Sequence, residues 1–339
     1  MRGDELLYPI EQRIENRRMG VTRQRWPILV PILTIAMISV FIYELVLNAR
    51  FQGTAISFHP TVNYMLGPGG STLINVGARF VPCMKDVPEV PPTTQLACMN
   101  DTANPADQIC PLATVCGFGG FGPNDVPNQW FRFILPIFLH VGIIHILLNM
   151  LAQATLCSYQ VERQVGSTAF LIIYFASGIF GNVLGGNFAL VGLTSMGASG
   201  AIFSCVAAQW VDLLAHWGLE DHPVRSLVFL IIELIVGIGL GYIPGVDNFA
   251  HLGGLLMGLL TSVVLFPVIS RTRRHMIIVW IFRIVAIPLI IILFVVLIRN
   301  FYTTDPSATC PWCRYLSCIP TSANNYCQGT GLTTGNTAF

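Results

Sequence analysis

Seven long apolar runs occur in this chain of 339 residues and leave it few ways to fold. A run of about 20 apolar residues can cross a bilayer as a helix, because a helix satisfies its own backbone polar groups there. Charged residues make up only 10% of the chain, whereas soluble domains have about 25%. The sequence therefore predicts an all-α polytopic membrane protein with seven transmembrane helices, at residues 26–47, 133–157, 168–188, 199–215, 226–243, 249–269 and 276–297.

Arginine is distributed unevenly between the two ends of the predicted helices. The loops at 189–198 and 244–248 carry none, whereas the loop at 270–275 carries three. Six more precede the first run, at positions 2, 13, 17, 18, 23 and 25. Since Lys and Arg are retained on the cytosolic side, we expect a cytosolic N-terminus and, after seven spans, a luminal or extracellular C-terminus. This orientation is the inverse of that in seven-helix receptors and argues against that class.

The runs also divide the chain into parts. We expect a cytosolic segment at 1–25, a first transmembrane helix at 26–48, a luminal or extracellular loop at 49–130, a core of helices two to six at 131–270, a seventh helix at 276–298 and a tail at 299–339. A loop of about 80 residues is marginal for a core of its own unless disulfides support it. We therefore interpret the loop as an extension of the membrane domain.

Eight of the ten cysteines gather in the two segments that we place outside the cytosol, four in the loop and four in the tail. Only Cys157 and Cys205 fall near or within the apolar runs. This clustering favours disulfides formed in an oxidising compartment. Cys310 and Cys313 could instead form half of a zinc site, although a disulfide is favoured for a tail outside the cytosol. Asn100 begins an Asn-Asp-Thr sequon, which would allow glycosylation of the loop.

Polar side chains in three of the runs form a pattern. His145 and Asn149 lie in the second run at i, i+4 spacing and share a helix face. Ser199 opens the fourth run, and His251 lies in the first turn of the sixth. Polar groups within a bilayer are costly, so they suggest function by default. We interpret His140, which precedes this pattern, as a structural residue of the loop.

Helix rise places three of these side chains at a similar depth. Polar residues after each run mark the expected cytosolic side. His145 lies 17 residues before Glu162, and Ser199 lies 17 residues before His216. His251 lies 20 residues before Arg271. At about 1.5 Å per residue these separations are roughly 26–30 Å, close to the ~30 Å thickness of the hydrocarbon core. We therefore expect the three side chains to meet at one level, slightly below the outer surface.

A serine at the start of a submerged helix is a candidate nucleophile. His251 could remove the proton of Ser199. The free N–H groups of the helix start, together with the helix dipole, could stabilise negative charge on a substrate oxygen. Asn149 and His145 are further donors for this oxyanion. Asp247 lies one turn before His251 and is a weaker candidate to orient its ring.

Three separated motifs in the chain resemble the rhomboid intramembrane serine proteases. They are His140-x4-His145-x3-Asn149, Gly197-Ala198-Ser199-Gly200 and Ala250-His251-x-Gly253-Gly254-x3-Gly258. The match covers the second to sixth predicted helices and has the motifs in the family's order. The additional seventh helix resembles the six-plus-one form of eukaryotic secretory-pathway rhomboids. The resemblance therefore implies a six-helix rhomboid core followed by one C-terminal helix.

The resemblance also implies a function. It implies a Ser199–His251 dyad with His145 and Asn149 in the oxyanion hole. The enzyme would be a serine endopeptidase that cleaves single-span membrane proteins in or near their transmembrane segment, without a metal, ATP or another cofactor. Its expected partners are these substrates and the lipid bilayer, not nucleic acid. Its expected location is a Golgi, endosomal or plasma membrane.

Two residues depart from the family pattern. The family usually has a Trp-Arg pair in the first loop, whereas this chain has Phe131 directly before Arg132. The residue one turn after the serine is often a tyrosine that supports the histidine ring, whereas this chain has Phe203. Neither change removes a reacting group, so they affect the anchoring of the loop and the orientation of His251.

Each motif also has a simpler explanation. The Gly-Ala-Ser-Gly motif could serve close helix packing, and His145 with Asn149 could be a hydrogen-bonded pair between helices. We interpret Gly254 and Gly258 as packing residues even within a protease, and we expect Gly197 and Gly200 to leave room for a substrate backbone.

Two other functions compete with the protease. A catalytically weak or inactive rhomboid-like protein that binds membrane clients for trafficking or degradation would be expected to lack the serine or the histidine. A transporter or channel would gather polar groups at the bilayer midplane rather than near one surface.

Overall fold

The computed structural model describes residues 9–122, 125–243, 246–318, 327 and 329–332. Among these residues, five helices are long and apolar enough to cross a membrane. Each lies within a few residues of one predicted run. They are α2 (Leu29–Gln52), α8 (Ser167–Phe188), α10 (Pro223–Leu240), α11 (Asn248–Leu265) and α12 (Arg273–Phe301).

The other two predicted runs form shorter helices. The fourth run is α9 (Ser199–Ala215), an apolar helix of 17 residues. The second run is not one continuous helix, and the prediction of a helix from residue 133 is wrong. Gly142 lies against the carbonyl group of Met65, where any side chain would collide. Its backbone is extended, with φ 177° and ψ 177°, so a helix cannot pass through this position. The chain passes through the 3₁₀ turns η1 (Trp130–Phe133) and η2 (Leu135–Ile137) and then forms α6 (Ile143–Ala152), the π-helix η3 (Gln153–Glu162) and α7 (Arg163–Val165).

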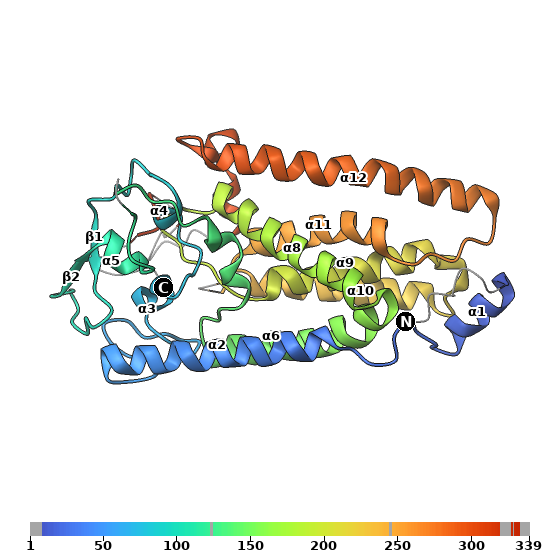
Figure 1. Ribbon diagram of the computed structural model, residues 1–339, viewed down its shortest axis with the longest axis horizontal. Helices are drawn as coiled ribbons and strands as arrows, with labels where there is room; N and C mark the ends of the chain where they lie inside the picture. Colours follow the sequence, from blue (N-terminus) through green and yellow to red (C-terminus); the bar gives the residue numbers. More distant parts are fainter. Residues whose placement is uncertain (1–8, 123–124, 244–245, 319–326, 328, 333–339) are drawn as a thin grey trace.

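Helices α8, α9 and α11 pack together in the middle of the bundle, with α2 and α12 on opposite sides (Figure 1). Glycines permit the close contact between α9 and α11. A side chain at Gly254 would collide with the carbonyl oxygen of Gly200, and a Cβ at Gly258 would lie 2.6 Å from the Cα of Ser204. The predicted packing role of Gly254 and Gly258 is therefore confirmed.

A small folded region precedes η1 and lies at one end of the bundle (Figure 1). Its two strands pair antiparallel, with Leu96 opposite Cys110. Disulfides join Cys83 to Cys116 and Cys98 to Cys110, as expected for a region too small for an extensive core. The region, hereafter the loop region, contains α3 (Gly70–Asn75), α4 (Val81–Met84), β1 (Gln95–Ala97), β2 (Ile109–Pro111) and α5 (Leu112–Cys116).

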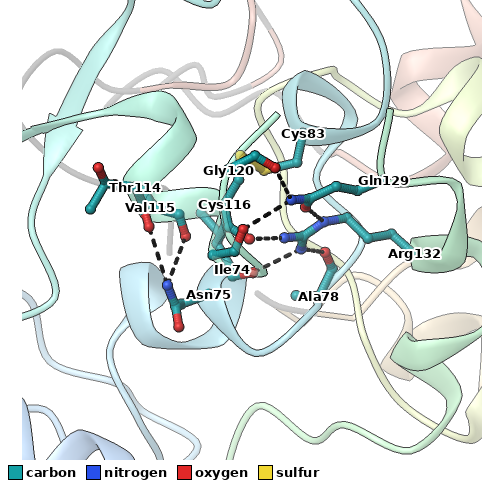
Figure 2. Close-up of a disulfide and its surroundings, with 11 residues drawn as sticks. Ile74, Asn75, Ala78, Cys83, Thr114, Val115, Cys116, Gly120, Gln129 and Arg132 are labelled. Atoms are coloured by element: carbon teal, nitrogen blue, oxygen red, sulfur yellow. Dashed lines mark hydrogen bonds between the residues drawn. A yellow bond between two sulfur atoms is a disulfide. The ribbon is translucent and has the colours of Figure 1, made fainter. Parts of the chain in front are cut away.

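Arg132 anchors the loop region to the helices (Figure 2). Its guanidinium group is fully buried and donates hydrogen bonds to the carbonyl oxygens of Ile74, Ala78 and Cys116, at 2.8, 2.6 and 2.5 Å. It also donates to the side chain of Gln129 at 2.7 Å. Five donors in a fixed fork suit this convergence of carbonyl groups. Arg132 therefore holds the loop region in place, although Phe131 stands where the family usually has a tryptophan.

The tail continues on the same end of the bundle, beyond α12. It contains the 3₁₀ turns η5 (Pro306–Thr309) and η6 (Cys313–Leu316). Disulfides join Cys310 to Cys313 and Cys318 to Cys327, so the structure has the disulfide rather than half of a zinc site. Residues 319–326, 328 and 333–339 of the predicted tail lie outside the described residues.

Cys157 and Cys205, which lie in the predicted runs, also form a disulfide, between η3 and α9. Sequence reasoning did not anticipate this pair, because a hydrophobic pattern does not show which helices touch.

The short helix α1 (Ile10–Arg18) lies at the opposite end of the bundle from the loop region (Figure 1). Arg17 on this helix forms an ion pair with Asp212 near the end of α9, at 2.8 Å. His216 contacts the same carboxylate at 2.7 Å. Most of the arginines that precede the first run therefore lie at the end away from the disulfides of the loop region and the tail, whereas Arg2 lies outside the described residues.

Candidate active site

Ser199 and His251 face each other between the first residues of α9 and α11. The hydroxyl oxygen of Ser199 lies 2.8 Å from Nε2 of His251. The other ring nitrogen, Nδ1, lies 3.1 Å from the carbonyl oxygen of Gly237 on α10. A proton on Nδ1 donated to this carbonyl leaves Nε2 free to accept the serine proton. The arrangement is that of a nucleophile held against a base.

Phe203 supports the ring of His251 from one face. The two rings are nearly parallel, with centroids 4.5 Å apart and an interplanar angle of 13°. Phe203 lies one turn after Ser199 on α9, so the helix that carries the serine also holds the histidine ring. The phenyl ring provides the stacking contact without a hydroxyl group.

His145 and Asn149 lie on the buried face of α6, next to the loop that leads into Ser199. A Cβ at Gly197 would lie 2.7 Å from Cε1 of His145 and 3.6 Å from Nδ2 of Asn149. Both ring nitrogens of His145 and the amide nitrogen of Asn149 are buried and have no hydrogen-bond partner in the part of the chain that the structure describes. Buried donors without partners are rare in folded proteins, so these groups are available to a ligand.

His140 lies beside this pair, just before α6. Its ring packs edge-on against His145, with centroids 5.4 Å apart, and its backbone N–H group lies 3.4 Å from a carboxylate oxygen of Glu44 on α2. The side chain is fully buried. Both ring nitrogens are buried and, like those of His145, have no hydrogen-bond partner among the described residues. The structural role of His140 stays a prediction.

A cavity of about 240 Å³ joins these groups. Its walls come from α6, α9, α10 and the first turn of α11, and they are almost entirely apolar. Ser199, His251, His145 and Asn149 all line it, and Glu233 on α10 is the acidic residue among its lining residues. Residues from four segments that are distant in sequence thus meet at one apolar cavity.

Proteins of a known family are similar to this chain in sequence. A profile of the Rhomboid domain matches residues 127–268, which include all four of these polar side chains. Rhomboid-type serine protease 2 of Emericella nidulans is 34% identical, over 94% of this chain and 75% of its own length. This chain belongs to the rhomboid family. RHOMBOID-like protein 4 of Arabidopsis thaliana is a further relative, 28% identical over 91% of this chain and 74% of its own length.

Rhomboid relatives of this chain include proteins named as inactive. Inactive rhomboid protein 1 of Danio rerio is 31% identical, over 68% of this chain and 26% of its own length. Membership of the family therefore does not separate a protease from an inactive relative. The residues of the site in this chain must make that distinction.

The ring nitrogens of His251 lie against Ser199 and Gly237, so Asp247, the weaker candidate to orient the ring, does not hydrogen-bond to either of them. Its carboxylate forms an ion pair with Arg79 at 2.6 Å. It also accepts hydrogen bonds from the backbone N–H of Phe249 and the hydroxyl of Ser317, both at 2.9 Å. Asp247 thus caps α11, and the ring of His251 is oriented by a backbone carbonyl instead.

Arg79 connects the segment before Ser199 to the start of α11, although it belongs to none of the sequence motifs. Its backbone exchanges two hydrogen bonds with Ser195, at 2.9 and 3.0 Å. Ser195 lies four residues before Ser199, and Asp247 lies four residues before His251. The sequence feature that could have indicated this role is an isolated arginine within the apolar sequence Val-Gly-Ala-Arg-Phe.

Gly197 and Gly200 have different neighbours. Gly197 has a φ of 131° and faces His145 and Asn149. A Cβ at Gly200 would lie 3.0 Å from the carbonyl oxygen of Ala250 on α11. Gly200 thus faces α11 and permits helix packing, and its expected role toward a substrate stays a prediction.

Proposed function

We propose that this rhomboid is an intramembrane serine endopeptidase that cleaves single-span membrane proteins in or near their transmembrane segment. The observation that carries the proposal is the 2.8 Å contact between Ser199 and His251 at an apolar cavity. A hydroxyl group in this position has a base within hydrogen-bond distance, as nucleophilic catalysis requires. An apolar cavity suits a substrate that is itself a membrane helix.

The proposed reaction uses four side chains. Nε2 of His251 accepts the proton of Ser199 as Oγ bonds to the carbonyl carbon of the scissile peptide. The carbonyl oxygen becomes negatively charged and accepts hydrogen bonds from His145, Asn149 and the backbone N–H of Ser199. Donors that meet this charge in an apolar site stabilise the transition state more than the substrate.

The intermediate then collapses. The C–N bond breaks, His251 gives its proton to the leaving amine, and an acyl ester remains on Ser199. A water molecule activated by His251 attacks this ester, and the released Oγ recovers its proton. Every step needs only groups of this chain and water.

We also propose an orientation in the membrane. The N-terminus would be cytosolic, and the loop region and tail would face the lumen or the cell exterior, in a Golgi, endosomal or plasma membrane. Two observations support this orientation. The arginine-rich helix α1 lies at one end of the bundle, whereas four disulfides lie in the loop region and the tail, toward the other.

A client-binding protein without protease activity is the second candidate, and the similarity to inactive rhomboid protein 1 favours considering it. Such a protein needs the cavity but not the serine–histidine contact. The presence of both residues at hydrogen-bond distance favours the protease.

The decisive experiment compares purified wild type, Ser199→Ala and His251→Ala in liposomes with a panel of single-span substrates. Sequencing of the product ends locates the cleaved bond. We expect cleavage by the wild type, none by either variant, and labelling by a fluorophosphonate probe only in the wild type. Undiminished cleavage by folded Ser199→Ala would refute the mechanism, and substrate binding without cleavage by the wild type would favour the client-binding protein.

A further inference from the structure

Glu233 is a carboxylic acid in the middle of an apolar membrane-spanning helix. Within Pro223–Leu240, all of which the structure describes, it is the only acidic residue. A carboxylate in this position is expensive, and a leucine would fit the helix better. The mechanism proposed above does not use it, so its presence needs another explanation.

The side chain of Glu233 faces the same cavity as Ser199 and His251. One of its carboxylate oxygens, Oε2, is buried and has no hydrogen-bond partner among the residues described. The neighbouring walls are apolar residues such as Leu156 and Val206. A buried polar group without a partner costs free energy, so a ligand group that donates a hydrogen bond to Oε2 would remove this cost.

The helix register relates Glu233 to the reacting groups. It lies one turn before Gly237, whose carbonyl oxygen is 3.1 Å from Nδ1 of His251. One turn of helix advances about 5.4 Å, and an extended chain advances about 3.3 Å per residue. The ring of His251 and its contacts of 2.8 and 3.1 Å separate the hydroxyl of Ser199 from this carbonyl. With one helix turn the whole path is at most about 13 Å, so a substrate bound in extended form at Ser199 carries a side chain to Glu233 from a position within about four residues of the scissile bond.

We propose that Glu233 is a specificity-determining residue that selects substrates with a hydrogen-bond-donating side chain, lysine in the strongest case, within four residues of the scissile bond. The inference rests on the proposed protease function. A donor would supply the partner that Oε2 lacks, whereas an acidic side chain would place a second carboxylate in the apolar cavity. A site that hydrogen-bonds one side chain rejects analogues that lack it, because its own polar group is then left unpaired.

The test varies one single-span substrate at each of the four positions on either side of the scissile bond, one position at a time, with Leu, Asn, Lys or Asp. The wild type, Glu233→Gln, Glu233→Leu and Glu233→Lys are compared in liposomes, and kcat/KM is measured for each pair. Glu220→Gln is the matched control, because Glu220 does not line this cavity. Thermal melting shows that each variant is folded.

At one position we expect the wild type to prefer Lys and Asn over Asp by about tenfold or more. Glu233→Leu should remove this ratio, Glu233→Gln should remove the discrimination against Asp, and Glu233→Lys should reverse it. Glu220→Gln should keep the wild-type ratio. The same ratios in folded Glu233→Leu and the wild type would overturn the inference, as would complete loss of cleavage in both folded Glu233→Gln and Glu233→Leu. Failure of the wild type to cleave any version would instead overturn the proposed protease function.

Discussion

Arg79 and Asp247 form a buried ion pair, with 2.6 Å between Nη2 and Oδ2 and side-chain exposures of 1% and 5%. The pair joins the segment before Ser199 to the first turn of the helix that carries His251. Gly185 on α8 makes room for it, because any side chain there would collide with both groups. The contact between the serine and the histidine is thus supported by an ion pair that touches neither of them.

Breaking this ion pair should lower both stability and activity. Asp247→Asn leaves the charge of Arg79 buried without its partner, which costs about 3–5 kcal/mol in comparable cases. We expect a clear fall in the melting temperature and a fall in kcat, because the segments that carry Ser199 and His251 lose their common support. The combination of Arg79→Met with Asp247→Leu should recover part of the stability.

Arg17→Ala is the matched control for this prediction. It also breaks an ion pair, with Asp212 at 2.8 Å, but both partners are partly exposed at the other end of the bundle. Exposed pairs contribute about 0–1 kcal/mol. Equal effects of Arg17→Ala and Asp247→Asn on melting temperature and kcat would contradict the role assigned to the buried pair.

Removal of the buried donors should lower turnover rather than binding. Asn149→Ala and His145→Ala each remove a group that would meet charge only in the transition state, and the loss of one such donor costs about 100-fold or more in kcat. Leu148→Ala is the control, since Leu148 lines the same cavity without a polar group. Kinetics in liposomes should show a fall in kcat for the first two variants. A rise in KM alone would argue against the oxyanion role.

Hydrophobicity was sufficient to predict most of the helices but not how they meet. The five long spans follow from apolar runs, whereas the helix of the second run starts only after Gly142, whose backbone is extended. Polar residues at matched depth predicted that Ser199 and His251 would come together, because depth follows from helix rise alone. The pairing of Arg79 with Asp247 could not be predicted, since backbone contacts of a loop with distant segments leave no periodic pattern.

The orientation in the membrane can be tested with the Cys310–Cys313 disulfide of the tail. Intact cells are treated with a membrane-impermeant reductant and then with an impermeant maleimide. We expect labelling of Cys310 and Cys313, which the Cys310→Ser/Cys313→Ser variant should lose. Cys157 and Cys205 are fully buried and should stay unlabelled. Labelling of the tail only after the cells are permeabilised would reverse the proposed orientation.

Lys85, the only lysine of the chain, should make stability depend on pH. It is buried in the loop region, and its amino group donates to the carbonyl oxygen of Thr303 at 2.7 Å. Burial lowers the pKa of this amine to about 8, although Asp305 and Glu89 act in the opposite direction. The unfolded chain has a lysine pKa of about 10.4. Folding therefore disfavours the charged amine, and this penalty is complete below pH ~8 and disappears above the unfolded pKa.

We therefore expect the melting temperature of the wild type to rise relative to that of Lys85→Met as the pH increases from about 7 to about 9.5, across the lower pKa. Lys85→Arg is the control, because arginine stays charged throughout this range. Differential scanning fluorimetry in detergent measures all three proteins. Parallel pH profiles for the wild type and Lys85→Arg would show that Lys85 titrates as it does in the unfolded chain.

A methyl group at Gly197 should abolish the proposed oxyanion site while the helices stay folded. Its Cβ would lie 2.7 Å from the ring of His145, closer than real contacts allow, and 3.6 Å from the amide nitrogen of Asn149. The φ of 131° also strains any other residue, at a cost of about 1–3 kcal/mol.

Gly53→Ala separates the backbone strain from the collision, because Gly53 has a φ of 76° but nothing within 4 Å of an added Cβ. We expect both variants to melt at lower temperature and only Gly197→Ala to lose about 100-fold or more in kcat. Equal kcat values for the two variants would show that the space beside Gly197 is not where the oxyanion forms.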